Sequence, residues 1–210
     1  MEAPYDPSPP ALILFDFGGV LLHLNDPVET FGFGHSHEEF NRLWLDSPAV
    51  RAHETGRVEP ETFARRIVRD MGLPYSWQEF LQRFAAWPDR VHAVTSQLVQ
   101  GIPREIDCAI LSNTNALHWH VQDIERDFGG RISRCFLSFE SGLIKPDAGA
   151  FTQVFEATDH RPGDILFIDD NPKNIEAARL QGMRTQHCAN VFALGDILQA
   201  EGLLARRTVV

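Results

Sequence analysis

Cysteine is scarce in this chain of 210 residues, and its spacing indicates neither a metal centre nor a disulfide framework. The three cysteines are odd in number, form no CxxC pair and lie in or near predicted strands, at Cys108, Cys135 and Cys188. Core thiols that stay reduced are typical of proteins from a reducing compartment. We therefore expect three free thiols and a cytoplasmic location.

Long apolar runs and an excess of positive charge are also lacking. No stretch of about 18 apolar residues occurs, so we expect no membrane-spanning helix. The formal net charge of −10 argues against nucleic acid as a partner, because nucleic-acid binders usually carry a basic patch. A small anionic substrate stays compatible with this charge, since a bound metal ion reverses the local field. Nothing in the sequence specifies an oligomeric state.

The first ten residues are rich in proline and lack the basic-then-apolar pattern of a signal peptide. We expect residues 1–10 to form a flexible tail. The most informative stretch of the chain begins directly after this tail and reads ALILFDFGGVLL, at residues 11–22.

The stretch begins with an apolar run, Ala11 to Phe15, which has no polar break and predicts a strand buried on both faces of a parallel sheet. The run ends at Asp16, and Gly18 and Gly19 follow closely. Open α/β sheets place their ligand sites at the carboxyl ends of strands. Glycines there let the backbone come close to a bound group. A capping Asp in an ordinary turn is the alternative on this stretch alone.

Residues 25–100 carry helix signals only. Capping boxes begin at Ser36 and Ser76 and predict short helices, and the break at Trp87-Pro88 predicts another helix over 91–99. We expect this block to be a small helical cap.

Strand and helix signals alternate in the remainder, including a single helix over 115–128 and a strand over 135–139. This alternation predicts a parallel sheet with right-handed crossovers. The expected fold class is therefore α/β, with a Rossmann-like three-layer core of residues 11–24 and 101–210 and the cap inserted after the first strand.

Three of the predicted strands end in polar residues, namely Asp16, Ser112-Asn113 and Asp169-Asp170. The carboxyl ends of parallel strands lie at one edge of a sheet, so we expect these side chains to converge. Three carboxylates at one edge repel one another unless a cation neutralises them. Carboxylate oxygens without nearby His or Cys favour Mg²⁺.

Taken together, four short motifs in this order resemble the haloacid dehalogenase superfamily. The motifs are Asp16-Phe17-Gly18-Gly19-Val20, Leu111-Ser112-Asn113, Lys145-Pro146, and Asp169-Asp170 with Asn174 four residues later. The helical block after the first motif resembles the small cap of that superfamily. The stretches LSNTN, GLIKPD and FIDDNPKNIEAA further resemble bacterial phosphatases that act on hexose 1-phosphates.

The resemblance implies a Mg²⁺-dependent phosphatase of a small phosphorylated metabolite, with a sugar phosphate as the expected substrate. Asp16 is then the nucleophile, and it forms an aspartyl-phosphate. The Asp16 carboxylate, the Gly18 carbonyl and Asp170 bind Mg²⁺, and Asp169 binds it directly or through water. Asn174 orients the acids.

The phosphate-binding residues implied by the resemblance come from three of the motifs. Ser112 and the Asn113 amide hold phosphate oxygens, together with the Phe17 and Gly18 amides. Lys145 neutralises charge on the phosphoryl group and on Asp16. Without the resemblance, a solvated loop lysine is the simpler interpretation of Lys145.

The sequence departs from the superfamily at Gly18, where most of its phosphatases carry a second Asp as general acid and base. The leaving oxygen must then take its proton from water or from a cap residue such as His23. Three further residues in the cap or at its base are candidates for substrate contact or for a hidden acid, with simple surface exposure as the alternative: Asp26, His53 and Glu54.

Two histidine pairs have i, i+2 spacing, His35 with His37 and His118 with His120. They sit at a helix start and inside a predicted helix, where residues two apart diverge, so neither pair predicts a metal site.

Two other functions stay open at this point. Carbon–halogen hydrolysis resembles the same fold and nucleophile but needs no metal, and the paired acids Asp169-Asp170 disfavour it. A phosphate-ligand binding protein without turnover is supported by Gly18 alone.

Overall fold

The computed structural model describes residues 8–34 and 36–204, and most of the predicted tail, residues 1–7, lies outside this range. A five-stranded parallel sheet forms the centre, in the order β5-β4-β1-β6-β7. The strands are β1 (Leu12–Phe15), β4 (Asp107–Ser112), β5 (Arg134–Leu137), β6 (Ile165–Asp169) and β7 (Arg184–His187). The predicted α/β fold class is confirmed.

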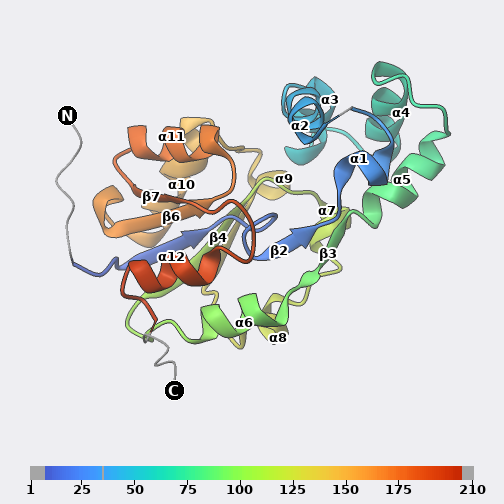
Figure 1. Ribbon diagram of the computed structural model, residues 1–210. Coiled ribbons are helices and arrows are strands. Elements are labelled where there is room, and N and C mark those ends of the chain that lie inside the picture. The colour runs from blue at the N-terminus through green and yellow to red at the C-terminus, as the bar shows by residue number, and fades with distance from the viewer. Residues whose placement is uncertain (1–7, 35, 205–210) are drawn as a thin grey trace.

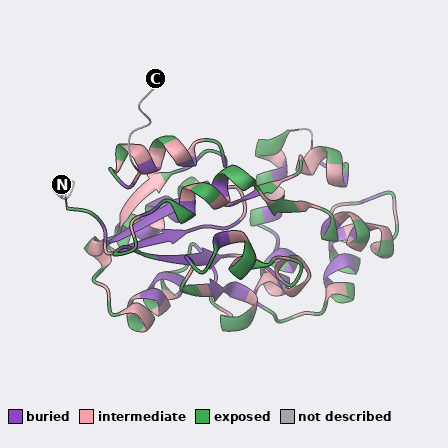
Figure 2. Ribbon diagram, turned by 90° about the horizontal axis from the view of Figure 1, so that it is seen from below, coloured by how far each residue is buried: buried purple, intermediate pink, exposed green. Residues whose placement is uncertain are grey.

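Helices cover both faces of this sheet, and the three layers are visible in Figure 1. One layer holds α6 (Ala93–Gln100), α8 (Ile124–Phe128) and α12 (Leu194–Ala200), and the other holds α10 (Ala148–Thr158) and α11 (Pro172–Leu180). Because side chains alternate along a strand, Ile13 and Phe15 pack into the first layer, whereas Leu12 and Leu14 pack into the second. Figure 2 shows the strands as the most buried part of the chain.

Five helices that follow β1 and precede β4 in the sequence share a separate aromatic cluster, and we call them the cap helices. They are α1 (Pro27–Phe31), α2 (His37–Leu45), α3 (Pro48–Glu54), α4 (Pro60–Asp70) and α5 (Trp77–Ala85). Phe31 lies at the centre of the cluster and stacks on Phe40, Trp44 and Phe80. The predicted N-terminal capping residues are confirmed. The Ser36 hydroxyl accepts from the Glu39 amide at 3.2 Å at the start of α2, and the Ser76 hydroxyl accepts from the Glu79 amide at the start of α5.

The connection between the cap helices and the core differs from the sequence prediction. β2 (Leu22–Leu24) and β3 (Pro88–Val91) form a small antiparallel sheet at the base of the cap helices. The residues after Trp87 therefore begin as a strand. The helix that follows, α6, packs on α8 and α12 rather than on the cap helices. By packing, α6 therefore belongs with the core, although the sequence prediction placed residues up to 100 in the cap.

The remaining corrections concern short helices. The helix predicted over 115–128 is two helices, α7 (Ala116–Trp119) and α8. Asp123 separates them, because its carboxylate caps α8 by accepting from the Arg126 amide at 3.1 Å. The strand predicted to reach residue 139 stops earlier, since α9 (Ser138–Ser141) begins there. A 3₁₀ turn, η1 (Pro162–Asp164), precedes β6.

All three cysteines are free thiols, as predicted. Burial raises the pKa of each, Cys108, Cys135 and Cys188, to about 11, which leaves them protonated and unreactive at neutral pH. In the part of the chain that the structure describes, every helix is too short or too polar to cross a bilayer.

Candidate active site

The predicted convergence of polar strand ends is present in the structure. β1 lies between β4 and β6, so Asp16, Ser112 and Asp169 lie at the carboxyl ends of three adjacent strands. Gly19 makes the turn after Asp16 with a φ of 82°. A Cβ at Gly19 would lie 2.4 Å from an Asp170 Oδ2. The turn therefore requires glycine both for its backbone conformation and for the space that Asp170 occupies.

Asp16, Asp169 and Asp170 form a cluster whose ligand oxygens lie within 4.8 Å of one another. Lys145 is buried among them, with 1% of its side chain exposed. Its Nζ lies 2.7 Å from Asp16 Oδ1 and 2.7 Å from Asp169 Oδ2. Burial lowers the pKa of Lys145, but the two carboxylates outweigh it and raise the pKa overall, so the ammonium stays charged.

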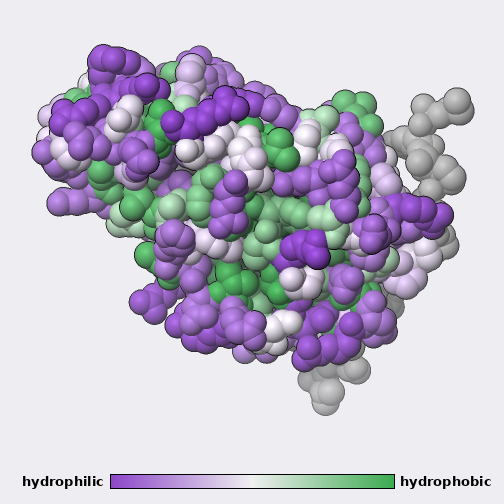
Figure 3. Space-filling model, turned by 180° about the vertical axis from the view of Figure 1, so that it is seen from behind, coloured by the Kyte–Doolittle hydropathy of each residue, from purple (hydrophilic) through white to green (hydrophobic). Residues whose placement is uncertain are grey.

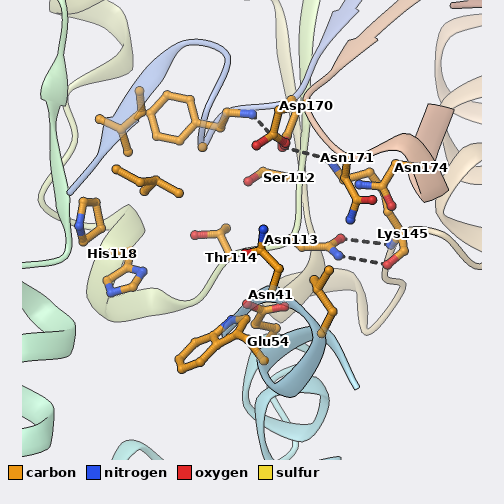
Figure 4. A pocket seen from close by; sticks show the side chains of 18 of the residues that line it. Asn41, Glu54, Ser112, Asn113, Thr114, His118, Lys145, Asp170, Asn171 and Asn174 are labelled. Carbon is orange, nitrogen blue, oxygen red and sulfur yellow. Dashed lines mark hydrogen bonds and ion pairs between the residues drawn. The ribbon is translucent and has the colours of Figure 1, made fainter. Parts of the chain in front are cut away.

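The backbone around Lys145 is fixed by Asn113. The Asn113 side chain accepts from the Lys145 amide at 2.9 Å and donates to the Lys145 carbonyl at 2.9 Å. Both contacts appear in Figure 4. The Asn113 side chain thus positions the lysine.

Asp169 and Asp170 have different surroundings. Both oxygens of Asp169 accept from the Asn174 amide nitrogen at 3.0 Å. Its Oδ1 also accepts from the Asn171 backbone at 2.7 Å, and its Oδ2 contacts Lys145. Each oxygen of Asp169 therefore has two partners already. The Asp170 carboxylate has no hydrogen bond or ion pair to another side chain among the described residues.

The charges at this edge fit a divalent cation. Burial raises the pKa of Asp16 well above its usual value. The Lys145 ammonium lowers this pKa, whereas repulsion from Asp169 and Asp170 raises it further. The pKa of Asp170 rises to about 6, chiefly through burial and then through Asp169. Three carboxylates against one ammonium leave the cluster short of positive charge, and oxygen donors of this kind suit Mg²⁺.

The residues expected to hold phosphate also lie at this edge. They line the cavity that opens beside the carboxylates, which is described below: Phe17, Gly18, Ser112 and Asn113. The Phe17 amide donates to Asp16 Oδ1 at 2.7 Å, so in this state it orients the carboxylate rather than pointing to an external anion.

A cavity of about 490 Å³ opens beside the carboxylates, between the cap helices and the core. In Figure 4, Asn41 and Glu54 lie on the side of the cap helices, opposite Asp170 and Ser112. Hydrophobic residues also gather on one face of the molecule between the cap helices and the core (Figure 3). The apolar side chains that line the cavity are those of Phe17, Leu22, Leu24, Phe40, Trp44, Leu45, Trp87, Pro88 and Pro172.

Of the four cap or base candidates, Glu54 alone lines the cavity. His23 is exposed. Asp26 caps α1 and contacts His37 at 2.5 Å. His53 is buried against Phe63, with ring centroids 4.3 Å apart.

In the described residues, the acid cluster is the one group of three or more potential metal ligands, and His118 and His120 are not part of it. His35 lies outside the described residues. His118 lines the cavity, but its Nε2 contacts the Phe84 carbonyl at 2.7 Å. Burial lowers the His118 pKa to about 4, so the ring is neutral.

Sequence reasoning missed several polar residues of the cavity wall. Asn41, Thr114, Asn171 and Lys173 all line it. The position of Asn171 directly after Asp169-Asp170 was a usable signal. No sequence signal marked Asn41, because its exposure to the cavity depends on how α2 faces the core.

The sequence profile of the haloacid dehalogenase-like hydrolases matches residues 10–182, which include every motif residue of this site. The chain belongs to that family. It is thus a hydrolase of the haloacid dehalogenase-like type, and the predicted superfamily is confirmed. The narrower hexose-1-phosphate subgroup stays a prediction.

The curated relatives of this hydrolase include a phosphatase. The chain is 24% identical over 182 residues to the sesquiterpene phosphatase astK of Aspergillus oryzae, covering 86% of this chain and 90% of that protein.

Two solved structures are similar to this chain. The enzyme bt-2542 of Bacteroides thetaiotaomicron, solved with magnesium and inorganic phosphate, is 25% identical with a TM-score of 0.66, covering 84% of this chain and 92% of that one. An L-2-haloacid dehalogenase of Xanthobacter autotrophicus shares the fold, at 15% identity and a TM-score of 0.58, covering 84% of this chain and 76% of that one.

Proposed function

We propose that this hydrolase is a Mg²⁺-dependent phosphatase that works through an aspartyl-phosphate at Asp16. The observation that carries the proposal is the buried cluster of Asp16, Lys145, Asp169 and Asp170 beside a cavity. A carboxylate nucleophile divides phosphate ester hydrolysis into two easier displacements.

The metal ligands in this proposal are the Asp16 carboxylate, the Gly18 carbonyl and Asp170. When bound, Mg²⁺ offsets the repulsion between an anionic nucleophile and an anionic phosphate. Asp169 is not a ligand in this account, because both of its oxygens already have two partners. Asp169 instead holds Lys145 and is itself held by Asn174.

Lys145 and the β4 end complete the phosphate-binding part of the proposal. The Lys145 ammonium stabilises negative charge on the phosphoryl oxygens, and Ser112 and the Asn113 amide hold those oxygens in place. A lysine that stays charged while buried suits this role, since its electrostatic effect is strongest away from water.

Two observations favour phosphoryl transfer over carbon–halogen hydrolysis. The acid pair Asp169-Asp170 has no use in a metal-free dehalogenase, and here Asp170 adds a third carboxylate to the cluster. The bt-2542 enzyme, which resembles this chain, was solved with magnesium and phosphate.

For the substrate, we favour a phosphate ester of an apolar alcohol. On the cap side of the cavity, Phe40, Trp44, Leu45 and Trp87 offer apolar contact area for a hydrocarbon chain, beside the polar side chains of Asn41 and Glu54. The similar astK protein is a sesquiterpene phosphatase. The sugar phosphate expected from the sequence stays an untested prediction, and the experiment below compares the two classes.

The test is a phosphate-release assay with farnesyl phosphate, glucose 1-phosphate and p-nitrophenyl phosphate, with Mg²⁺ and with a chelator. We expect release that requires Mg²⁺, and kcat/KM at least about tenfold higher for farnesyl phosphate than for glucose 1-phosphate, because two buried methylenes already contribute that much. Preference for glucose 1-phosphate would restore the sugar-phosphate prediction. Failure to hydrolyse any ester, together with turnover of a 2-haloacid, would refute the phosphatase.

A further inference from the structure

The structure leaves one chemical task of the proposed phosphatase without a residue. When the bond between phosphorus and the leaving oxygen breaks, that oxygen gains negative charge and needs a proton unless the alcohol is acidic. Gly18 occupies the position from which an Asp serves this task in most of the superfamily's phosphatases. A donor must therefore come from elsewhere in the cavity.

Within residues 8–34 and 36–204, few titratable side chains line the cavity, and most of these are already engaged or permanently charged. They are Asp16, Glu54, His118, Lys145, Asp170 and Lys173. Asp16 is the nucleophile and Asp170 a metal ligand in this account. Lys145 is committed to two carboxylates. The neutral His118 ring has its Nε2 on the Phe84 carbonyl, and Lys173 lies 3.8 Å from Asp46.

Glu54 is different from all of these. It is the last residue of α3, is partly buried, and lines the cavity. Among the described residues its carboxyl group has no hydrogen-bond partner, although its neighbours His53 and Thr55 are both bonded within the cap helices. In Figure 4 it lies across the cavity from Asp170.

The end of α3 is also anchored to the core. Arg51 forms an ion pair with Asp147, two residues after Lys145. Gly56 packs so closely on α9 that a Cβ there would lie 2.4 Å from the Phe139 carbonyl. These contacts on either side of Glu54 fix its helix end to the core segment that carries the lysine.

We propose that Glu54 is the general acid and base of this phosphatase, supplied by the cap in place of the acid missing at Gly18. The inference rests on the proposed function. As Asp16 bonds to phosphorus and the leaving oxygen departs, the Glu54 carboxyl gives that oxygen its proton and the alcohol is released. The Glu54 carboxylate then takes a proton from the water that attacks the aspartyl-phosphate. This second step breaks the bond between phosphorus and Asp16, releases inorganic phosphate, and restores the Asp16 carboxylate and the protonated Glu54 carboxyl.

The protonation of Glu54 suits both steps. Burial raises the pKa of Glu54 to about 7, against the opposing charge of Lys145. A group with a pKa near the working pH is a good donor and a good acceptor in turn. Lys145 is the charged side chain whose field reaches Glu54.

The test compares Glu54→Gln with the unmodified protein on two esters, hexyl phosphate and p-nitrophenyl phosphate. Protonation helps most when the leaving group is poor. We expect kcat/KM for hexyl phosphate to fall about 10²- to 10⁴-fold and that for p-nitrophenyl phosphate to fall by less than about tenfold. In the unmodified protein kcat/KM for hexyl phosphate falls above pH of about 7, and this limb disappears in Glu54→Gln.

The matched control is Glu59→Gln, the same change at an exposed cap residue outside the cavity, and it leaves both esters unaffected. Glu54→Asp keeps the carboxyl group and recovers part of the hexyl phosphate activity, which separates lost chemistry from lost folding. An equal fall for both esters, or no fall for either, would overturn the role of Glu54. So would an unmodified protein that hydrolyses p-nitrophenyl phosphate alone. Inactivity of the unmodified protein on both esters would instead refute the phosphatase.

Discussion

Asp169 and Asp170 are neighbours in the sequence, yet their surroundings give them separate tasks. Asp169 is fully buried and holds Lys145 and Asn174, whereas Asp170 turns its carboxylate toward the other acids without a side-chain partner among the described residues. A residue that ligates the metal directly contributes a bond to it, while a residue that acts through a neighbour contributes indirectly.

Substituting the two acids separately tests this difference. We expect Asp170→Asn to raise the Mg²⁺ concentration for half-maximal activity more than about 100-fold, since a carboxylate ligand is lost. Asp169→Asn raises it by about 10- to 100-fold or less and mainly lowers kcat, because Lys145 loses an anchor. Magnesium titrations of phosphate release measure both. Equal shifts in the Mg²⁺ requirement would mean that both acids bind the metal.

At the residue scale, the sequence identified the acid cluster and Lys145 because their positions follow from strand ends and motif order. It named Glu54 as one of four candidates for a hidden acid, with His23 put first and Asp26 and His53 beside it. Position at the cavity distinguishes them, since Glu54 is the one of the four that lines it, and that position depends on how α3 packs on α9. The sequence does not encode that packing in any local pattern.

At the scale of elements, the turn after β1 is the most constrained segment of the site. Gly19 has a φ of 82° and leaves space for the Asp170 carboxylate. Helix and strand signals around it predicted the main elements. They missed β2, which has only three residues, and β3, whose sequence PDRV begins with proline and carries two charged residues, so that it resembles a break in the chain.

Replacing Gly19 with Ala tests this turn. The new Cβ would overlap Asp170 Oδ2, so we expect kcat to fall more than about 100-fold through displacement of a metal-binding carboxylate. The left-handed backbone adds about 1–2 kcal/mol of lost stability, measurable by chemical denaturation. Gly72→Ala is the control, because Gly72 has a φ of 63° but no atom within 4 Å of its Cβ position. It should lose similar stability and keep its activity, and equal activity in both variants would refute the steric account.

At the scale of the whole molecule, the site lies between the core and the cap helices, and both contribute residues to it. The sheet supplies the nucleophile and its neighbours, and the cap helices supply the apolar wall and Glu54. The sequence predicted a cap after the first strand, but it assigned α6 to the cap, whereas α6 packs on the core. Helix periodicity shows that a helix has an apolar face, and it does not show which unit that face contacts.

The central claim is that Asp16 becomes phosphorylated during turnover, and the most direct measurement is mass spectrometry of acid-quenched protein. We expect one phosphoryl group on the peptide that contains Asp16, released by hydroxylamine as an acyl phosphate and absent from Asp16→Asn, which folds normally and loses turnover by several powers of ten. Rapid phosphate release from a protein that never carries a phosphoryl group at Asp16 would contradict the account.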